Sequence, residues 1–368
     1  MLLHHIYKLI QPLIFKIDPE SLHGMVNQFL KIYSFLNTGS SGKENRLRQN
    51  FFGKEFKNPV GMAAGYDKEG DLIRGIASLG FGFLECGTFT LNRQAGNPRP
   101  RIFRIPEKRA IVNRMGFNNP GIEAGLKNIV KLIRAPLSTA ISIGKSKETS
   151  PEDAAKDYHK IIELINACPL VDNFSYIALN ISSPNTPGLR VLQSKEYLFD
   201  LIKGCRDLSR LPIVVKVAPD FSNLKEFSEV VNTVVSAGAS GLIVTNTTTD
   251  PNFFQSIPEY IREKGGGISG APLKERSLVY LKEAYSITGQ SVPLISSGGL
   301  MGPADPWERL LWGASLVQIY TGLIYYGPAI AFDSIAYMKE QMEKLGIVTI
   351  GEVTKNREYI RKIWKEQL

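Results

Sequence analysis

Short apolar runs alternate with amphipathic windows along most of the chain after residue 58. Eight runs of β-branched and other apolar residues predict strands that are buried on both faces, as in a parallel sheet. They span residues 59–63, 81–87, 138–144, 176–182, 212–218, 241–246, 293–298 and 316–321. Helical windows such as 152–166, 223–236 and 273–287 separate most of them. Eight strand–helix units in about 270 residues predict an α/β fold, a (β/α)8 barrel.

A doubly wound open sheet is the main alternative to this barrel. No GxGxxG follows the first predicted strand, which counts against a dinucleotide-binding version of that fold. One insertion interrupts the repeat. Residues 101–105 and 110–113 flank Pro106, Glu107 and Lys108, and this pattern predicts a hairpin between the second strand and its helix.

The first 38 residues have a different pattern. Apolar residues recur from Leu2 to Ile17 at steps of three and four, which predicts an amphipathic helix that Pro12 bends. Asp18, Pro19 and Glu20 form a helix start, and a second apolar face follows up to Leu36. Residues 37–42 predict a linker. The two helices either pack on the larger domain or form an apolar cleft on a membrane surface, where a lipid-soluble ligand enters.

We therefore divide the chain into an amphipathic segment (1–38), a barrel (43–350) and a basic C-terminal tail (351–368). The net charge of +9 favours anionic partners such as phosphate, a carboxylate or an anionic bilayer. No basic tract is interleaved with aromatic residues, so we expect no nucleic acid partner. The three cysteines and four histidines show no metal-ligand spacing, so we expect no metal. We also expect neither a transmembrane helix nor a cleaved secretory signal.

Polar and glycine residues follow the predicted strands, where parallel barrels carry their chemistry. The fourth strand runs into Asn180, Ser183 and Asn185, and the fifth contains Lys216. Glycines follow the sixth, seventh and eighth strands at 265–270, 298–299 and 322, which predicts a phosphate-bearing cofactor at the rim. Asn113, Asn180, Asn185 and Asn246 should converge there. Amides donate and accept hydrogen bonds, so they suit a flat heterocycle with alternating N–H and C=O groups.

The motifs GMAAGYDK, ECGTFT, NRMGFNNPG, NISSPNTPGLR, VKVAPD, VTNTT, GGISGAPL and LVQIYTG resemble those of class 2, quinone-linked dihydroorotate dehydrogenases. The resemblance covers roughly residues 5–350. It implies one FMN per chain and oxidation of dihydroorotate to orotate in pyrimidine synthesis, with a membrane quinone as electron acceptor. It also implies a peripheral protein on the cytoplasmic side of the cell inner membrane, and we expect a monomer.

The resemblance also implies roles for individual residues. Ser183 matches the catalytic base, where class 1 enzymes have cysteine. Substrate contacts match Lys68, Asn113, Arg114, Met115, Gly116, Phe117, Asn180, Asn185, Asn246 and Thr247. FMN contacts match Ala64, Gly65, Tyr66, Asp67, Lys68, Thr88, Asn180, Lys216, Thr245, Gly270, Gly299, Tyr320 and Thr321. The quinone head group matches His23, Arg104 and Tyr320. Ser142 stands where the family usually has a flavin-contacting asparagine, so that contact is altered or replaced by water.

The implied reaction removes a proton from carbon 5 and a hydride from carbon 6 of dihydroorotate. Ser183 would pass its proton on through Thr186 and a water near Phe117, and Lys216 would stabilise negative charge on the flavin. Two alternatives stay open. One is a class 1 enzyme that uses fumarate or NAD, against which Ser183 and the helical start argue. The other is a non-catalytic barrel that binds a nucleotide or a membrane.

Overall fold

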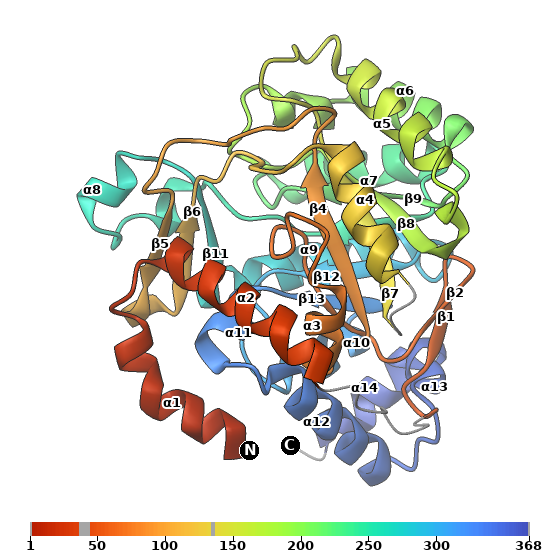
Figure 1. Cartoon of the computed structure of the whole chain (residues 1–368). Helices are drawn as coiled ribbons and strands as arrows, with labels where there is room; N and C mark the ends of the chain where they lie inside the picture. Colours follow the sequence, from red (N-terminus) through yellow and green to blue (C-terminus); the bar gives the residue numbers. More distant parts are fainter. Residues whose placement is uncertain (1, 37–44, 134–136, 367–368) are drawn as a thin grey trace.

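A closed parallel barrel forms the centre of the molecule, as the alternating pattern predicts (Figure 1). The computed structural model describes residues 2–36, 45–133 and 137–366. The barrel strands are β3 (Val60–Met62), β4 (Phe83–Phe89), β7 (Ser138–Ile143), β8 (Phe174–Asn180), β9 (Ile213–Val217), β10 (Gly241–Val244), β12 (Leu294–Ser297) and β13 (Leu316–Ile319). They close in the order β10-β12-β13-β3-β4-β7-β8-β9. All eight predicted strands and the (β/α)8 class are confirmed.

Helices surround the barrel, and their apolar faces pack on the strands. They are α3 (Ile73–Ser78), α4 (Ile122–Leu132), α5 (Ala154–Asn166), α6 (Lys195–Leu208), α7 (Leu224–Ser236), α9 (Lys274–Thr288), α10 (Asp305–Leu311), α11 (Thr321–Tyr326) and α12 (Ile330–Lys344). The short helix α8 (Glu259–Arg262) lies away from the barrel, and its Ile261 belongs to an apolar cluster with Val112 and Ile268. β8, β9 and β10 are buried along their whole length because helices cover one face and the barrel core the other. This double burial explains why the strands are continuously apolar in sequence.

A short hairpin closes the N-terminal end of the barrel. It consists of β1 (Gln49–Phe51) and β2 (Lys54–Phe56), which pair antiparallel. Phe56 is fully buried and packs on Phe83 inside the barrel, with the ring centroids 5.4 Å apart. The interior at this end is apolar, so polar groups that enter the barrel gather at the opposite, C-terminal end.

The predicted insertion is a hairpin, but it belongs to a larger sheet than the sequence indicates. β5 (Ile102–Ile105) pairs with β6 (Ala110–Asn113), and β6 also pairs with β11 (Gly267–Gly270). We expected residues 265–270 to form a glycine-rich loop, and for 267–270 this was wrong. The glycines allow close approach: a Cβ on Gly266 would lie 2.4 Å from the carbonyl oxygen of Asn113.

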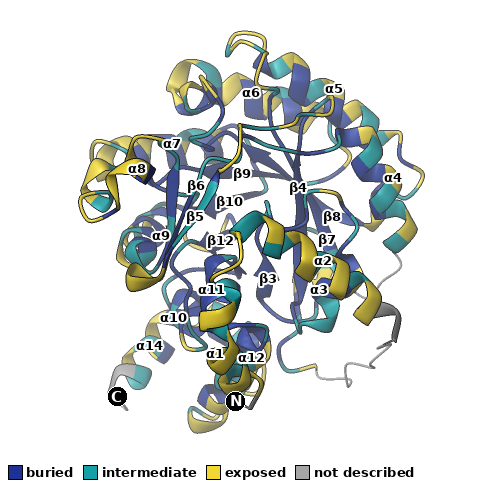
Figure 2. Ribbon diagram, turned by 60° about the vertical axis from the view of Figure 1, so that its left-hand side comes forward, coloured by how far each residue is buried: buried dark blue, intermediate teal, exposed yellow. Residues whose placement is uncertain are grey.

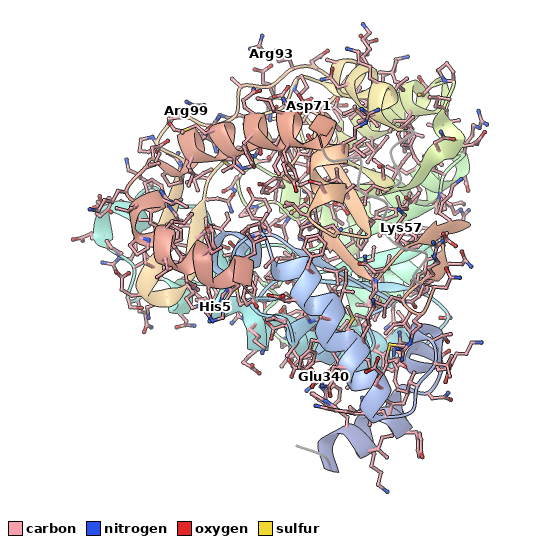
Figure 3. The ribbon with its side chains drawn as sticks, turned by 60° about the horizontal axis from the view of Figure 1, so that its bottom comes forward. His5, Lys57, Asp71, Arg93, Arg99 and Glu340 are labelled. Atoms are coloured by element: carbon pink, nitrogen blue, oxygen red, sulfur yellow. The ribbon has the colours of Figure 1, made fainter. Side chains whose placement is uncertain are left out.

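The predicted N-terminal helices are present as α1 (Leu2–Ile14) and α2 (Pro19–Leu36), outside the barrel (Figure 1). Pro12 lies inside α1, and the Asp18 carboxylate accepts the Ser21 N–H at 2.8 Å, as expected of an N-cap. The whole predicted linker, residues 37–42, lies outside the described residues. Ion pairs hold both ends of α2: Lys31 with Asp71 and Glu20 with Arg99, and Figure 3 shows Asp71 and Arg99 at opposite ends of this helix.

The segment expected as a basic C-terminal tail is folded over its described part. α13 (Ile350–Lys355) and α14 (Arg357–Glu366) pack beside α10. Val353 and Ile360 are buried, and the Arg357 guanidinium donates to the carbonyl oxygens of Leu310 and Ala314. The C-terminal helices therefore support the barrel wall.

Candidate active site

One cavity of about 530 Å³ occupies the C-terminal end of the barrel and continues under α1 and α2. Its two halves differ in chemistry. Amides, hydroxyls, glycines and lysines from the strand ends surround the barrel half. The half under the helices is lined mainly by Tyr7, Ile10, Ile14, Leu22, Val26, Phe29, Leu30, Leu323 and Ile324. The cavity thus joins a polar pocket to an apolar passage that leads outward between the N-terminal helices.

The four predicted asparagines meet in the polar half. Asn185 Nδ2 donates to Asn113 Oδ1 at 3.0 Å, and Asn246 Nδ2 lies 3.3 Å from Asn180 Oδ1. Asn180 Nδ2 donates to Thr88 Oγ1 at 3.0 Å. These side chains come from β4, β6, β8 and the loops after β8 and β10, so the barrel and the three-stranded sheet of β6 together bring them close. They form a ring of amides around the space where a flat polar ligand fits.

Ser183 lies in the loop directly after β8 and lines the same cavity. Its side-chain oxygen accepts the N–H of Asn185 at 3.3 Å, and the residue is 7% exposed. Three residues further on, the Thr186 hydroxyl is buried without a hydrogen-bond partner among the described groups. A buried hydroxyl without a partner is costly, so its presence in the same loop as Ser183 is a functional signal.

Lys216, which is buried, and Lys68, which is partly buried, bring positive charge to the cavity. Burial lowers the pKa of Lys68 to about 8, with Glu20 acting in the opposite direction. Burial also lowers the pKa of Lys216 on β9, and Glu85 opposes this change. Within the described parts of the chain, neither ammonium group lies within 4 Å of a carboxylate. Such cations are suited to an anionic ligand, because no protein carboxylate neutralises them.

The rim after β12 and β13 has the geometry of a phosphate site. Gly298 and Gly299 have φ of +102° and +77°, and a Cβ on Gly299 would lie 2.2 Å from the Lys274 Cα. Ser269 and Thr321 line the opposite wall, and their hydroxyl oxygens are 2.8 Å apart. The glycines let backbone N–H groups approach a ligand closely, so the residues fit a bound phosphate.

Three predicted site residues do not line this cavity: Asp67, Arg114 and Ser142. The Asp67 carboxylate accepts the N–H groups of residues 70–72 and so shapes the loop that carries Lys68. The Ser142 hydroxyl is fully buried and lies 3.0 Å from Thr88 Oγ1, one hydrogen bond behind the cavity wall. Side-chain direction in a loop depends on local backbone hydrogen bonds, which motif position does not reveal.

The predicted quinone residues surround the apolar half. His23 Nε2 lies 3.1 Å from the Tyr66 carbonyl oxygen, and the Tyr320 hydroxyl donates to the Gly65 carbonyl oxygen at 3.4 Å. Burial, together with the charge of Lys68, lowers the pKa of His23 to about 3, so its ring is neutral at physiological pH. Arg104 donates to the Ile14 and Ile17 carbonyl oxygens and thereby connects β5 to the end of α1.

Sequence reasoning missed several residues of the cavity wall. They are chiefly Ser269, Ser297, Leu300, Gln318, Leu323, Ile324 and Pro328. Ser297 and Gln318 lie within predicted strands, where inward direction could have been inferred from the alternation of a barrel strand. Among the described residues, no group of three or more His, Cys, Asp or Glu side chains could hold a metal ion. No described helix is long and apolar enough to span a bilayer.

The fold and this pocket define a barrel enzyme of the flavin-dependent oxidoreductase class. A model of the family described as dihydroorotate dehydrogenase matches residues 46–356. The chain belongs to this family, which confirms the resemblance.

The names of similar proteins support the quinone-linked type of this family. A protein of Stenotrophomonas maltophilia (strain K279a) named "Dihydroorotate dehydrogenase (quinone)" is 39% identical over 350 residues, 92% of this chain and 97% of its own length. One of Sulfurovum sp. (strain NBC37-1) with the same name is 38% identical, covering 94% of this chain and 97% of its own length. A crystal structure of ligand-free DHODH from Eimeria tenella has a TM-score of 0.82 at 32% identity, covering 91% of this chain and 98% of that one. Nothing in these matches favours the class 1 alternative.

Proposed function

We propose that this chain oxidises dihydroorotate to orotate with a bound FMN and passes the electrons to a membrane quinone. The single observation that carries the proposal is Ser183, which lines a cavity together with the four asparagines and two lysines, Lys68 and Lys216. The names of the relatives support the substrate and the acceptor.

Lys68 and the amides would hold the substrate. The Lys68 ammonium suits the carboxylate of dihydroorotate, because burial strengthens the attraction between unlike charges. Asn113, Asn185 and Asn246 suit the alternating N–H and C=O groups of the pyrimidine ring. Met115, Gly116 and Phe117, which also line the cavity, would back the ring.

Ser183 would accept the proton from carbon 5. A serine hydroxyl is a weak base, so it must transfer its own proton as it reacts. Thr186 provides the next oxygen, and the absence of another partner leaves its hydroxyl available for this relay. Phe117 also lines the cavity and would limit the access of bulk water.

The residues of the rim fit FMN. Gly270, Gly299 and Thr321 would hold the phosphate, while Ala64, Thr88 and Thr245 line the barrel mouth where the ring would lie. When bound, FMN supplies the hydride acceptor of the reaction. Lys216 would stabilise negative charge on the ring because its ammonium is already in place before reaction.

The N-terminal segment would bind the membrane and admit the quinone. Leu9, Leu13 and Phe29 are 79%, 66% and 63% exposed. Apolar side chains this exposed on two adjacent helices are typical of a surface that lies in a lipid interface. The excess of basic residues would favour an anionic leaflet, which supports a peripheral position on the cytoplasmic side of the inner membrane.

Flavin spectroscopy of the purified full-length protein tests the function. We expect a yellow protein whose flavin absorbance is bleached by dihydroorotate without oxygen. A quinone should restore the colour, whereas fumarate and NAD should not. A colourless preparation that cannot be reconstituted with FMN would contradict the proposal, as would fast reoxidation by fumarate.

A further inference from the structure

The backbone after β12 is fixed against helix α9 by contacts to one carbonyl group, that of Gly298. The Ser277 hydroxyl of α9 lies 2.7 Å from this oxygen, and Arg309 Nη2 of α10 lies 3.4 Å from it. Arg309 Nη2 also donates to the Lys274 carbonyl oxygen at 2.7 Å. Both Ser277 and Arg309 are fully buried behind the cavity wall, and neither lines the cavity.

This arrangement sets the direction of the next N–H group. In a trans peptide the C=O of one residue and the N–H of the next point in opposite directions. Because the Gly298 carbonyl points to Ser277 and Arg309, the Gly299 N–H points away from them, toward the cavity that Gly299 lines.

The backbone N–H groups of residues 299–302 fall into two pairs, one bound to a carboxylate and one without a partner in the described structure. The Asp305 carboxylate accepts the N–H of Met301 and of Gly302, at 2.5 and 2.8 Å. The N–H groups of Gly299 and Leu300 donate to no other group among the described residues. The loop therefore keeps two donors available at the rim where a phosphate fits.

Arg309 is also a buried cation close to this rim. It forms no ion pair within the described residues, and its Nε and Nη1 atoms have no hydrogen-bond partner. The carboxylates of Glu308, Asp305 and Glu275 act on it from further away, yet burial lowers the pKa of Arg309 to about 10. Lys274 also pairs with Asp305 and Glu308, at 2.7 and 3.5 Å. A phosphate dianion on the far side of the Gly298–Gly299 peptide would add a negative charge near this guanidinium in a dry environment.

We propose that Ser277 and Arg309 are positioning residues for the cofactor phosphate: they hold the Gly298 carbonyl away from the cavity and thereby aim the Gly299 N–H at the phosphate. The inference rests on the proposed function, since it assumes FMN. It predicts that the two side chains contribute to the binding of FMN but not of riboflavin, which has the same ring and no phosphate.

A competition experiment measures this contribution on the full-length holoenzyme. The protein is equilibrated with mixtures of FMN and riboflavin, free flavin is removed, and the bound flavins are separated and quantified. For Arg309→Met we expect the preference for FMN over riboflavin to fall at least about 10-fold, the scale of a charge-assisted hydrogen bond. For Ser277→Ala we expect a fall of about 3- to 10-fold. Arg309→Lys, which keeps the charge, should retain most of the preference.

Arg357→Met is the matched control. Arg357 is also a buried arginine that donates to two backbone carbonyl groups near α10, but it lies on α14 away from the cavity. We expect this variant to lose stability and keep the wild-type preference for FMN.

Each outcome distinguishes a role in positioning the phosphate site from a purely structural role. An unchanged preference in folded Arg309→Met, or a loss equal to that of Arg357→Met, would overturn the inference and leave Arg309 a structural residue. If Arg309→Met does not fold, an unchanged preference in Ser277→Ala overturns it instead. If the wild-type chain itself binds no flavin or does not prefer FMN, the proposed function fails, which is a distinguishable result.

Discussion

Lys68 illustrates how a single partly buried residue indicates chemistry. Its pKa is lowered to about 8 by burial, and no carboxylate lies within 4 Å of it in the described structure. Lys274, in contrast, is paired with Asp305, which raises its pKa despite partial burial. Burial of a cation is unfavourable unless an anion compensates it. The carboxylate of Asp305 compensates the charge of Lys274 within the protein, whereas the charge of Lys68 is left for an anionic ligand.

The binding of orotate should therefore depend on pH through Lys68. The protonated form binds the carboxylate, so affinity is full below the pKa of the free protein and declines as the pH rises through about 8. We expect the Kd of orotate to be constant from pH 6 to 7 and to increase up to about tenfold per pH unit above 8. Flavin absorbance changes on orotate titration measure it. In Lys68→Arg the pH at which the Kd of orotate begins to increase should be higher. A constant Kd up to pH 10 in the wild-type protein would contradict this role of Lys68.

Ser183→Ala should separate chemistry from binding. We expect the rate of flavin bleaching by dihydroorotate to fall at least about 100-fold, the usual scale for a positioned base. Orotate and FMN should bind nearly as before, because Ser183 makes one long contact to a backbone N–H. Stopped-flow absorbance measures the rate. Ser175→Ala, at the other end of β8, is the control and should react at the wild-type rate, whereas near-normal bleaching in Ser183→Ala would exclude the serine as base.

At the scale of elements, α1 has apolar side chains on two sides: Ile10 and Ile14 line the cavity, and further apolar side chains are exposed where an ordinary amphipathic helix of a globular protein would be polar. Its polar side chains face the barrel: Tyr7, Lys8 and Gln11 donate to the Ile324 and Tyr325 carbonyl oxygens at the end of α11. Leu3, Leu9 and Leu13 are exposed, and Figure 2 shows exposed residues along α1 and α2. The helix therefore presents apolar surface away from the protein core, which favours the membrane reading over simple packing on the barrel.

Charges on this outward face should release the protein from lipid. We expect the double variant Leu9→Glu, Leu13→Glu to lose binding to anionic vesicles, because carboxylates are repelled by anionic lipid and resist burial in the interface. Turnover with a water-soluble quinone should be retained and turnover with a long-tailed vesicle quinone lost. Vesicle sedimentation measures the binding. Val279→Glu, at an exposed apolar position on α9, should leave sedimentation unchanged, and equal binding of the double variant would contradict the membrane role.

The sequence predicts elements better than it predicts side-chain positions. The barrel strands are recognisable because burial on both faces leaves continuous apolar runs. The sequence does not predict β11, because Gly267 and Gly270 are typical of loops. The strand forms by pairing with β6, which is distant in the sequence. Asp67 and Ser142 match motif positions, yet backbone N–H groups or Thr88 occupy their oxygens. Arg309 and Ser277 carry no motif, and only the folded loop shows their common target.

At the scale of the whole molecule, the barrel is closed at one end and hollow at the other. The β1–β2 hairpin closes the N-terminal end with Phe56, while the cavity occupies the C-terminal end. A cofactor that fills such a cavity binds the folded chain alone, so it should raise the free energy of unfolding by mass action. We expect about 2.7 kcal/mol at free FMN of 100 times its Kd. Urea unfolding at several FMN concentrations measures this, and a midpoint independent of FMN would contradict it.

The two chemically distinct halves of the single cavity have a consequence for how the protein can change. A lipophilic inhibitor that enters between α1 and α2 would meet Leu22, Val26 and Phe29 and none of the amides that recognise the pyrimidine. Substitutions that alter sensitivity to such compounds, or adapt the enzyme to a different quinone tail, can therefore accumulate at one end. Such substitutions leave the polar half of the cavity unchanged, so they need not impair the oxidation of dihydroorotate.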